Sequence, residues 1–589
     1  MEKRIIYQVF PRIFGNMAKT RRKNGSIAEN GSGKFSAFTP AVLSGIRENG
    51  YTHIWYTGVL EHATQTDYTA YGIAKDHHAV VKGQAGSPYA VKDYYDVDPD
   101  LADCVPCRMQ EFEALIRRTH GAGMKVIIDF VPNHVARGYR SDARPVTVHD
   151  LGEHDNVFTD FDPNNNFYYL PGQTLVLHFD AEQEDFEYSE FPARATGNDC
   201  FHPSPGRSDW YETVKLNYGV DCLHGRKCCF DPVPDTWRKM LDILLFWAGK
   251  GVDGFRCDMA EMVPVEFWSW VIPEVKSRRD VCFIAEIYRP ELYREYIRRG
   301  HFDCLYDKVG LYDTLRDVIC GRQRADSITR RWQEVEDIRP HMLAFLENHD
   351  EQRIASDFFA GDARAGFPGM IVAAALDVNP VMVYSGQELG EPGMDEEGFS
   401  GRDGRTTIFD YWSLDCLQNL LLDGRRLTEA QQSLHRSYAQ LMRLAATEPA
   451  IRRGAFFDLM YANADNRFFN SRHLYAFMRK YRGDVILAVV NFDRNAAPTV
   501  RVRIPSEAFA TLRIADNRAA VLTDLFTGQQ TVGTLTAACP YGLSVPAYSG
   551  RLLRFRYDGG APSAGAPEPD DYAPANGALL PSCISSSFL

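Results

Sequence analysis

Residues 125–131 read Lys-Val-Ile-Ile-Asp-Phe-Val, a short run of mostly apolar and β-branched residues that is typical of a buried strand. The polar residues Asn133 and His134 follow it closely. Seven other runs of this kind occur along the chain, with helix-length segments between them, at 4–10, 53–59, 254–259, 283–287, 304–307, 343–350 and 381–388. Apolar strands that alternate with helices form parallel βαβ units, and eight such units predict a closed TIM (β/α)8 barrel, an α/β fold.

Two long segments depart from the barrel repeat. Residues 134–220 are rich in Asp, Asn, Gly, Pro and aromatic residues, and they make a connection far longer than a barrel loop requires. We expect them to form an inserted subdomain B after strand 3, with the catalytic barrel at 1–133 and 221–444. Short alternating strands predict a C-terminal β-sandwich domain over 445–557. The Gly-, Ala-, Pro- and Ser-rich segment 558–589 predicts a disordered tail.

The composition of the 589 residues is that of a globular protein, with 45% apolar and 24% charged residues. A net charge of −13 argues against nucleic acid or anionic lipid as a partner and suits a neutral ligand. No stretch reaches about 18 uninterrupted apolar residues, so we predict no membrane span. The sequence does not indicate an oligomeric state.

The N-terminus and the cysteines favour a cytoplasmic location. Residues 1–12 lack the apolar stretch of a signal peptide, and 13 cysteines, an odd number, suit a reducing compartment. A mature form of an exported protein would look the same. The spacing of Cys104 and Cys107 relative to the later cysteines matches no standard zinc motif, so we predict no metal site there.

Ionisable residues stand at the ends of several predicted strands, where parallel barrels carry their chemistry. Grouped carboxylates can bind a divalent cation, or they can act as nucleophile and proton donor on a glycosidic bond. Arg256, two residues before Asp258, favours the second use because its positive charge opposes a metal. A buried ion-pair network without chemistry is the alternative. The acids expected around one cavity are Asp258, Glu286 and Asp350, and Asp129 also stands at the end of a predicted strand.

These stretches resemble the four hallmark segments of the α-amylase family (glycoside hydrolase family 13), whose members are retaining glycoside hydrolases and transglycosylases. The segments lie at 129–134, 254–258, around Glu286 and at 345–350, in the right order and on the right strands, and the likeness covers roughly residues 4–544. A shorter fifth segment, 215–217, has Lys215 where an acid is usual nearby.

The resemblance implies a role for each matching residue. Asp258 would be the nucleophile, Glu286 the general acid/base, and Asp350 the residue that binds sugar hydroxyls and stabilises the transition state. The substrate-binding residues would be Tyr89, Asp129, His134, Arg256 and His349. The reaction requires no cofactor, but calcium is common in the family, and Asn133 would be its ligand here.

The mechanism sets two physical expectations. Retaining chemistry requires the carboxyl groups of Asp258 and Glu286 to lie about 5 to 5.5 Å apart, because no water fits between nucleophile and sugar in the first step. Glu286 should also have the more apolar surroundings, so that it is protonated near neutrality.

We therefore predict a glycosidase that cleaves α-glucosidic, mainly α-1,4, bonds in starch-derived glucans, malto-oligosaccharides or cyclodextrins. Residues 259–262 read Met-Ala-Glu-Met where many starch-degrading members have a Lys-His pair, which argues against ordinary endo-acting specificity. The alternatives are a glucanotransferase or branching enzyme of the same family, or a non-catalytic carbohydrate-binding relative. Asp403 and Arg405 would either reach the second sugar or form an ion pair within their loop.

Overall fold

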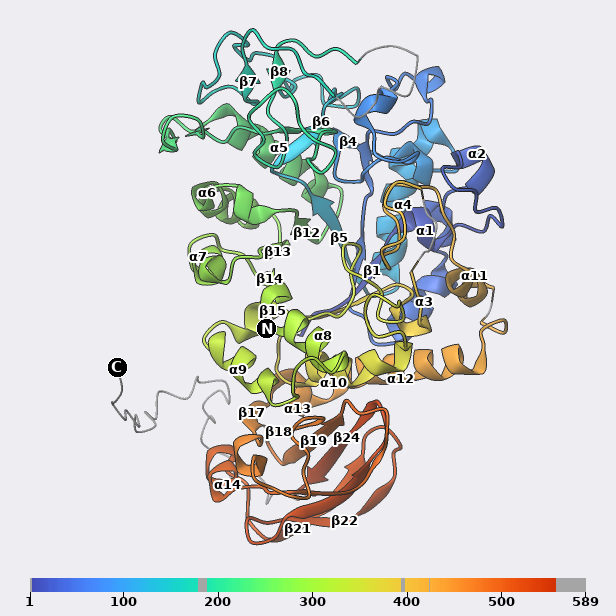
Figure 1. Cartoon of the computed structure of the whole chain (residues 1–589), viewed down its shortest axis with the longest axis vertical. Coiled ribbons are helices and arrows are strands. Elements are labelled where there is room, and N and C mark those ends of the chain that lie inside the picture. The colour runs from blue at the N-terminus through green and yellow to red at the C-terminus, as the bar shows by residue number, and fades with distance from the viewer. Residues whose placement is uncertain (1–2, 178–187, 394–397, 423, 558–589) are drawn as a thin grey trace.

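A ring of eight parallel strands forms the centre of the computed structural model, which describes residues 3–177, 188–393, 398–422 and 424–557 (Figure 1). A bridge between Ala344 and Val381 closes the ring and confirms the predicted barrel. In ring order the strands are β15 (Met342–Leu343), β14 (Cys304–Tyr306), β13 (Cys282–Ala285), β12 (Gly254–Cys257), β5 (Lys125–Phe130), β2 (His53–Tyr56), β1 (Ile5–Val9) and β16 (Val381–Tyr384).

Each strand starts within one residue of its predicted run and ends before that run does. The early ends have a common cause. Polar residues directly follow several strands, such as Thr57 after β2, Glu286 after β13 and Ser385 after β16, and the backbone leaves the ladder there to form the loops of the open face. The fully buried strand β12 shows this limit, because its ladder stops at Cys257 and Asp258 follows directly.

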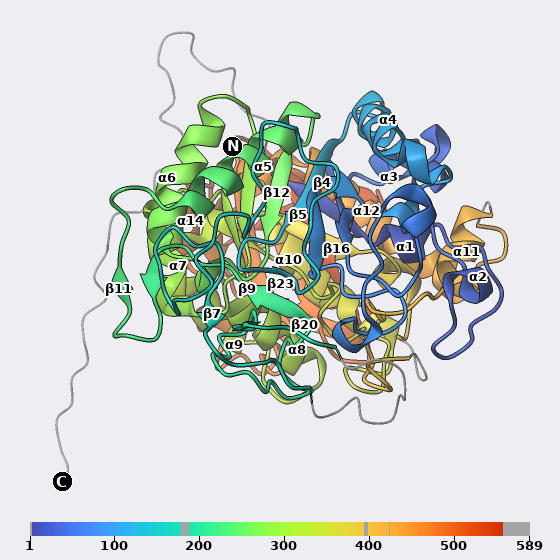
Figure 2. The ribbon, with the colours of Figure 1, turned by 90° about the horizontal axis from the view of Figure 1, so that it is seen from above.

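Helices surround the strands, as the view from above shows (Figure 2). Trp237, Leu244 and Ala248 bury one side of α5, as their helical spacing predicts. The principal helices are α3 (Pro40–Glu48), α4 (Arg108–Gly121), α5 (Asp235–Gly249), α6 (Val265–Lys276), α7 (Tyr293–Arg298), α8 (Asp313–Ile319), α9 (Ser327–Glu334), α10 (Phe367–Ala375) and α12 (Glu429–Thr447). Among the described residues, no helix has both the length and the apolar character needed to cross a membrane.

Short strand pairs lie at one end of the barrel, at the top of Figure 1. Within the insertion, β6 (His134–Ala136) pairs with β9 (Thr213–Lys215), and β7 (Tyr169–Leu170) pairs with β8 (Ala193–Arg194). A further antiparallel pair, β3 (Leu60–His62) with β4 (Val91–Val97), precedes the insertion and contacts it through β6. The sequence analysis did not anticipate this pair, because polar residues interrupt both strands.

The C-terminal region is an antiparallel β domain with two sheets, as predicted. The larger sheet has the order β17 (Ala455–Asp458), β18 (Leu474–Tyr481), β19 (Asp484–Asn491), β24 (Ser549–Arg556), β21 (Arg518–Asp524) and β22 (Gln530–Leu535). The smaller sheet pairs β20 (Ala497–Val502) with β23 (Tyr541–Val545). The predicted tail, 558–589, lies outside the described residues.

Helix α10 and Arg479 join the barrel to the C-terminal domain. Every residue of α10 is buried, and the helix contacts β19 and β24 as well as the barrel side. Arg479, on β18, is fully buried, and its guanidinium donates to the carbonyl oxygens of Leu376 at 2.6 Å and Gly454 at 2.7 Å. It also donates to the carbonyl oxygens of Ala450 and Ile451. One side chain thus satisfies the backbone at the junction of the two domains.

Replacing Arg479 with methionine should destabilise the protein strongly, because four buried carbonyl groups lose their donor and Asp377 loses one of its two arginine partners. We expect a loss of about 3 to 5 kcal/mol in the free energy of unfolding, measured by denaturant titration. Arg482→Met is the matched control, since Arg482 is exposed on the turn after β18, and its effect should stay within about 0.5 kcal/mol. Equal effects of the two substitutions would contradict the assigned role of Arg479.

Candidate active site

Arg256 lies at the centre of a cluster of acids at the carboxyl ends of the strands. It is fully buried on β12, and the register places it next to Asp129 of β5. Its Nη1 atom is 2.7 Å from Oδ1 of Asp258, and its Nη2 atom is 2.7 Å from Oε2 of Glu286. Carboxylates of Asp129 and Asp350 lie 3.6 Å and 3.9 Å from the same guanidinium. One positive charge therefore lies within 4 Å of four carboxylates.

Glu286 follows β13 and is surrounded by hydrogen-bond donors, so the expectation of apolar surroundings is wrong. Its Oε2 atom accepts from the backbone N–H of Met259 at 2.8 Å, in addition to the contact with Arg256. Its Oε1 atom accepts from the Tyr288 hydroxyl at 2.6 Å. Polar groups at three sides hold this carboxyl in one orientation. The separation of about 5 to 5.5 Å between the carboxyl groups of Asp258 and Glu286 stays a prediction.

Tyr288 was not among the predicted site residues. It stands two residues after Glu286, at the same end of the barrel as the other strand-end residues, so its position was a signal that could have revealed it. Burial and the nearby carboxylates of Glu286 and Asp350 raise the pKa of its phenol well above the ordinary value. The hydroxyl therefore stays protonated and remains a donor to Glu286.

Burial and the neighbouring charges affect the remaining acids in opposite directions. Burial raises the pKa of Asp258 well above its ordinary value, and the carboxylates of Glu286 and Asp350 add to this against the opposing charge of Arg256. For Asp350, burial is outweighed by His349, by its hydrogen bond and by Arg256, which together lower the pKa to about 2. The side chain of Asp350 is also 38% exposed, whereas that of Asp258 is 8% exposed. Asp350 is thus the acid most open to a ligand.

Tyr89 and His349 complete the cluster. Their rings stack with centroids 5.2 Å apart, and the Tyr89 hydroxyl lies 2.5 Å from Nε2 of His349 and 3.2 Å from Oδ1 of Asp129. Nε2 of His349 also contacts Asp350 at 2.9 Å, while Nδ1 is hydrogen-bonded to Gln8 at 2.8 Å. The side chain of Gln8 on β1 thereby fixes the ring of His349, a function that the sequence analysis did not assign.

His134 joins this group through Tyr89 rather than through the acids. Its ring is hydrogen-bonded to the backbone of Tyr89. It also lies beside the ring of Trp210, with ring centroids 5.1 Å apart. Burial, together with the charges of Lys215 and Lys82, lowers its pKa to about 3. The imidazole is therefore neutral at physiological pH.

The residues around Asn133 do not fit the calcium ion that the resemblance implies. The Oδ1 atom of Asn133, the expected ligand, accepts a hydrogen bond from Nζ of Lys215 at 2.7 Å. The same ammonium pairs with Asp199 at 2.6 Å. A lysine ammonium thus meets the oxygen atoms that a calcium ion would need, and its charge would repel the ion.

Asp403 and Arg405 form the ion pair within their loop that was one of the two expectations. Arg405 Nη1 lies 2.8 Å from Asp403 Oδ2, and Arg405 Nε donates to the backbone oxygen of Asp350 at 2.6 Å. The loop after β16 is thereby fastened to the backbone of the most open acid.

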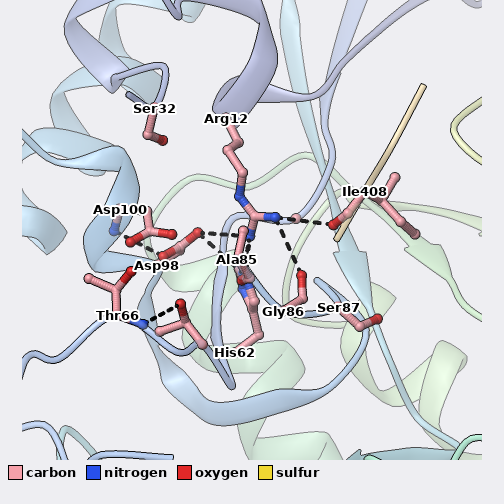
Figure 3. Close-up of polar contacts among 12 residues, drawn as sticks. Arg12, Ser32, His62, Thr66, Ala85, Gly86, Ser87, Asp98, Asp100 and Ile408 are labelled. Atoms are coloured by element: carbon pink, nitrogen blue, oxygen red, sulfur yellow. Dashed lines mark hydrogen bonds and ion pairs between the residues drawn. The ribbon is translucent and has the colours of Figure 1, made fainter. Parts of the chain in front are cut away.

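A second buried arginine supports the segment that carries Tyr89 (Figure 3). Arg12 is 1% exposed, and its guanidinium donates to the carbonyl oxygens of Ala85, Gly86 and Ile408. It is also hydrogen-bonded to His62 and lies 3.7 Å from Asp98. Arg12 thus joins the start of the barrel, the β3–β4 connection and the loop after β16. No local sequence pattern could reveal it, because most of its partners are backbone carbonyl groups.

Gly86 allows this connection to come close to the chain at Ala63. Its φ angle is +74°, and a Cβ atom there would lie 1.7 Å from the Ala63 carbonyl oxygen. Gly86→Ala should therefore lower the free energy of unfolding well beyond the roughly 1 kcal/mol cost of the backbone conformation alone. Gly72→Ala is the matched control, because Gly72 has φ +87° and nothing within 4 Å of the added atom. Thermal unfolding of both variants measures the difference, and similar midpoints would refute the steric argument.

The chain matches known proteins over most of its length. A family model of the α-amylase catalytic domain matches residues 8–440. Neopullulanase 2 of Thermoactinomyces vulgaris is 21% identical over 524 residues, which are 86% of this chain and 72% of that protein. The α-1,4-glucan:maltose-1-phosphate maltosyltransferase of Cereibacter sphaeroides is 28% identical over 305 residues, which are 51% of this chain and 40% of that protein.

A solved structure has the same fold. The α-amylase of Geobacillus thermoleovorans, crystallised in complex with acarbose, superposes with a TM-score of 0.62 at 18% sequence identity. The match covers 94% of this chain and 99% of that one.

Proposed function

The chain belongs to the α-amylase family, and from this premise we propose that it is a glycosidase that cleaves α-glucosidic, mainly α-1,4, bonds with retention of configuration. Its substrates would be starch-derived glucans, malto-oligosaccharides or cyclodextrins. One observation carries the proposal: Arg256 holds Asp258 and Glu286 side by side, each 2.7 Å from one of its terminal nitrogens, next to the more open Asp350.

The reaction follows from the roles of these acids. Asp258 attacks the anomeric carbon while Glu286 donates a proton to the departing glycosidic oxygen, which leaves a sugar covalently bound to Asp258. Glu286 then takes a proton from water, and that water releases the sugar from Asp258. Asp350, with the neighbouring His349, binds hydroxyl groups of the reacting sugar and stabilises its positive charge.

The four carboxylates around Arg256 outnumber its single positive charge, and we infer that one of them keeps the proton that the first step transfers to the leaving oxygen. Four carboxylates share the charge of Arg256, so the cluster retains a proton that belongs to the coupled group rather than to one residue. The raised pKa of Asp258 is consistent with this sharing. The proposed reaction needs this proton on Glu286, where it can reach the leaving oxygen, and needs Asp258 ionised beside Arg256.

Tyr89 offers an aromatic face for the sugar. The ring is fixed by its hydroxyl contacts to Asp129 and His349 and is stacked on the His349 ring, so we propose that its other face receives the apolar C–H face of a pyranose. We expect Tyr89→Ala to raise KM for maltoheptaose about 2- to 13-fold, as the loss of an aromatic contact of about 0.5 to 1.5 kcal/mol implies. Tyr89→Phe keeps the ring but loses the hydroxyl contacts to Asp129 and His349, so its KM should rise less than that of Tyr89→Ala. Equal KM values for both variants would refute the stacking.

A transferase remains the second candidate. A glucanotransferase would use the same covalent intermediate but pass the sugar to another hydroxyl group, and the likeness to the Cereibacter sphaeroides maltosyltransferase favours keeping it. A carbohydrate-binding protein without activity would not need a fixed proton donor, so the two hydrogen-bond donors to Glu286 and its ion pair with Arg256 argue against it.

Product analysis with maltoheptaose, β-cyclodextrin, pullulan and starch tests the proposal. We expect shorter maltosaccharides, their absence with Asp258→Asn, and a fall of about 10² to 10⁴ in kcat with Glu286→Gln, the range for removing a general acid. Asp337→Asn, in an exposed ion pair, is the control and should leave turnover unchanged. Products longer than the substrate would show that the protein is a transferase. Unchanged substrates would favour the carbohydrate-binding protein without activity.

A further inference from the structure

A second cluster of acids lies on the β3–β4 pair, apart from the acids around Arg256. The carboxylates of Glu61 on β3, Asp96 on β4 and Asp142 in the insertion offer oxygen atoms that all lie within 4.8 Å of one another. The register also places Asp93 of β4 opposite Glu61. Like charges that face each other across a strand pair destabilise it, so this arrangement needs a compensating charge.

Glu61 is the residue that lacks a partner. It is 1% exposed, and among the described residues neither of its carboxylate oxygens has a hydrogen-bond partner. A buried carboxylate without donors is costly, and proteins normally supply it with a cation or protonate it. Burial and the charges of Asp93, Asp142 and Asp96 raise its pKa to about 9, which agrees with an excess of negative charge at this point.

The other members of the cluster are held in place around Glu61. Asp93 accepts from Ser141 Oγ and from the backbone N–H groups of Asp142 and Ala143, which fastens this part of the insertion against β4. Asp142 itself is exposed, so an ion could enter from solvent. Asp93 thus holds the inner side of the cluster in place, and Asp142 forms its side toward solvent.

The nearby bases neutralise the cluster only in part, because Arg108 offers one charge to two of its acids. Arg108 contacts Asp96 at 2.5 Å and approaches Asp142 at 4.0 Å, which leaves Glu61 without a contact to it. Lys92 is directed to Asp76 at 2.9 Å. The four carboxylates of the cluster therefore lie near one guanidinium, that of Arg108. A doubly charged cation would balance part of the remaining negative charge.

We propose that Glu61, Asp96 and Asp142 bind a calcium ion that joins the β3–β4 pair to the inserted subdomain. Calcium prefers carboxylate oxygens at 2.3 to 2.6 Å, and ligands on opposite sides of such an ion lie about 4.6 to 5.2 Å apart, which fits the observed grouping. The site is separate from Asn133, where Lys215 takes up the available oxygen. Its existence does not depend on the proposed function.

Calorimetric titration of the chelator-treated protein with calcium chloride tests this, together with thermal unfolding with and without the ion. We expect one saturable site and a rise in the unfolding midpoint of several degrees. Glu61→Gln should abolish both effects, and in chelator it should unfold at or above the midpoint of the parent, because it removes a buried acid that lacks a partner. Asp142→Asn, which changes an exposed side chain, should weaken binding at least tenfold.

Asp199→Asn is the matched control, since it alters the ion pair beside Asn133 and should leave calcium binding unchanged. Three outcomes would overturn the proposal: no saturable binding to the parent, binding that persists in both Glu61→Gln and Asp142→Asn, or binding lost only in Asp199→Asn. In the first case Glu61 is a protonated carboxyl that shares its proton within the cluster. None of these outcomes bears on the glycosidase activity, which the product analysis measures separately.

Discussion

Arg256 places one buried positive charge where four carboxylates meet. The barrel stabilises this arrangement because it brings the four acids close to the guanidinium. The guanidinium is fully buried, so its charge would be very costly without acids at contact distance. The acids in turn come from β5, β12, β13 and the segment after β15, which are far apart in the sequence. Only a closed parallel sheet brings the ends of these strands to one place.

This constraint explains how much of the site the sequence could reveal. The strands are local patterns of apolar residues, and their carboxyl ends share one face of any parallel barrel, so the positions of Asp129, Arg256, Asp258 and Glu286 followed from the pattern alone. The surroundings of Glu286 did not follow. The contacts from Tyr288 and the Met259 backbone depend on the path of two loops, which no periodicity encodes.

Residues that act through the backbone were also hidden. Arg12 is bonded mainly to carbonyl oxygens, and such partners are present in every sequence, so nothing distinguished it from the other arginines. Lys215 was noticed as a departure from the family pattern, but its consequence required the position of Asp199, which lies in an irregular segment of the insertion. The sequence therefore indicated a departure from the family pattern at Lys215, but only the structure shows that this lysine meets Asn133, where calcium was expected.

Helix α10 has a consequence for how the two large parts of the chain depend on each other. It is apolar all round and lies between the barrel and the sheet of β19 and β24 (Figure 1). A helix of this kind has no face suited to water. Cutting the chain before β17 would uncover a helix in the wall of the barrel and invite aggregation. The C-terminal domain is therefore a structural part of the barrel's own core, and it could not be exchanged or removed like an appended module.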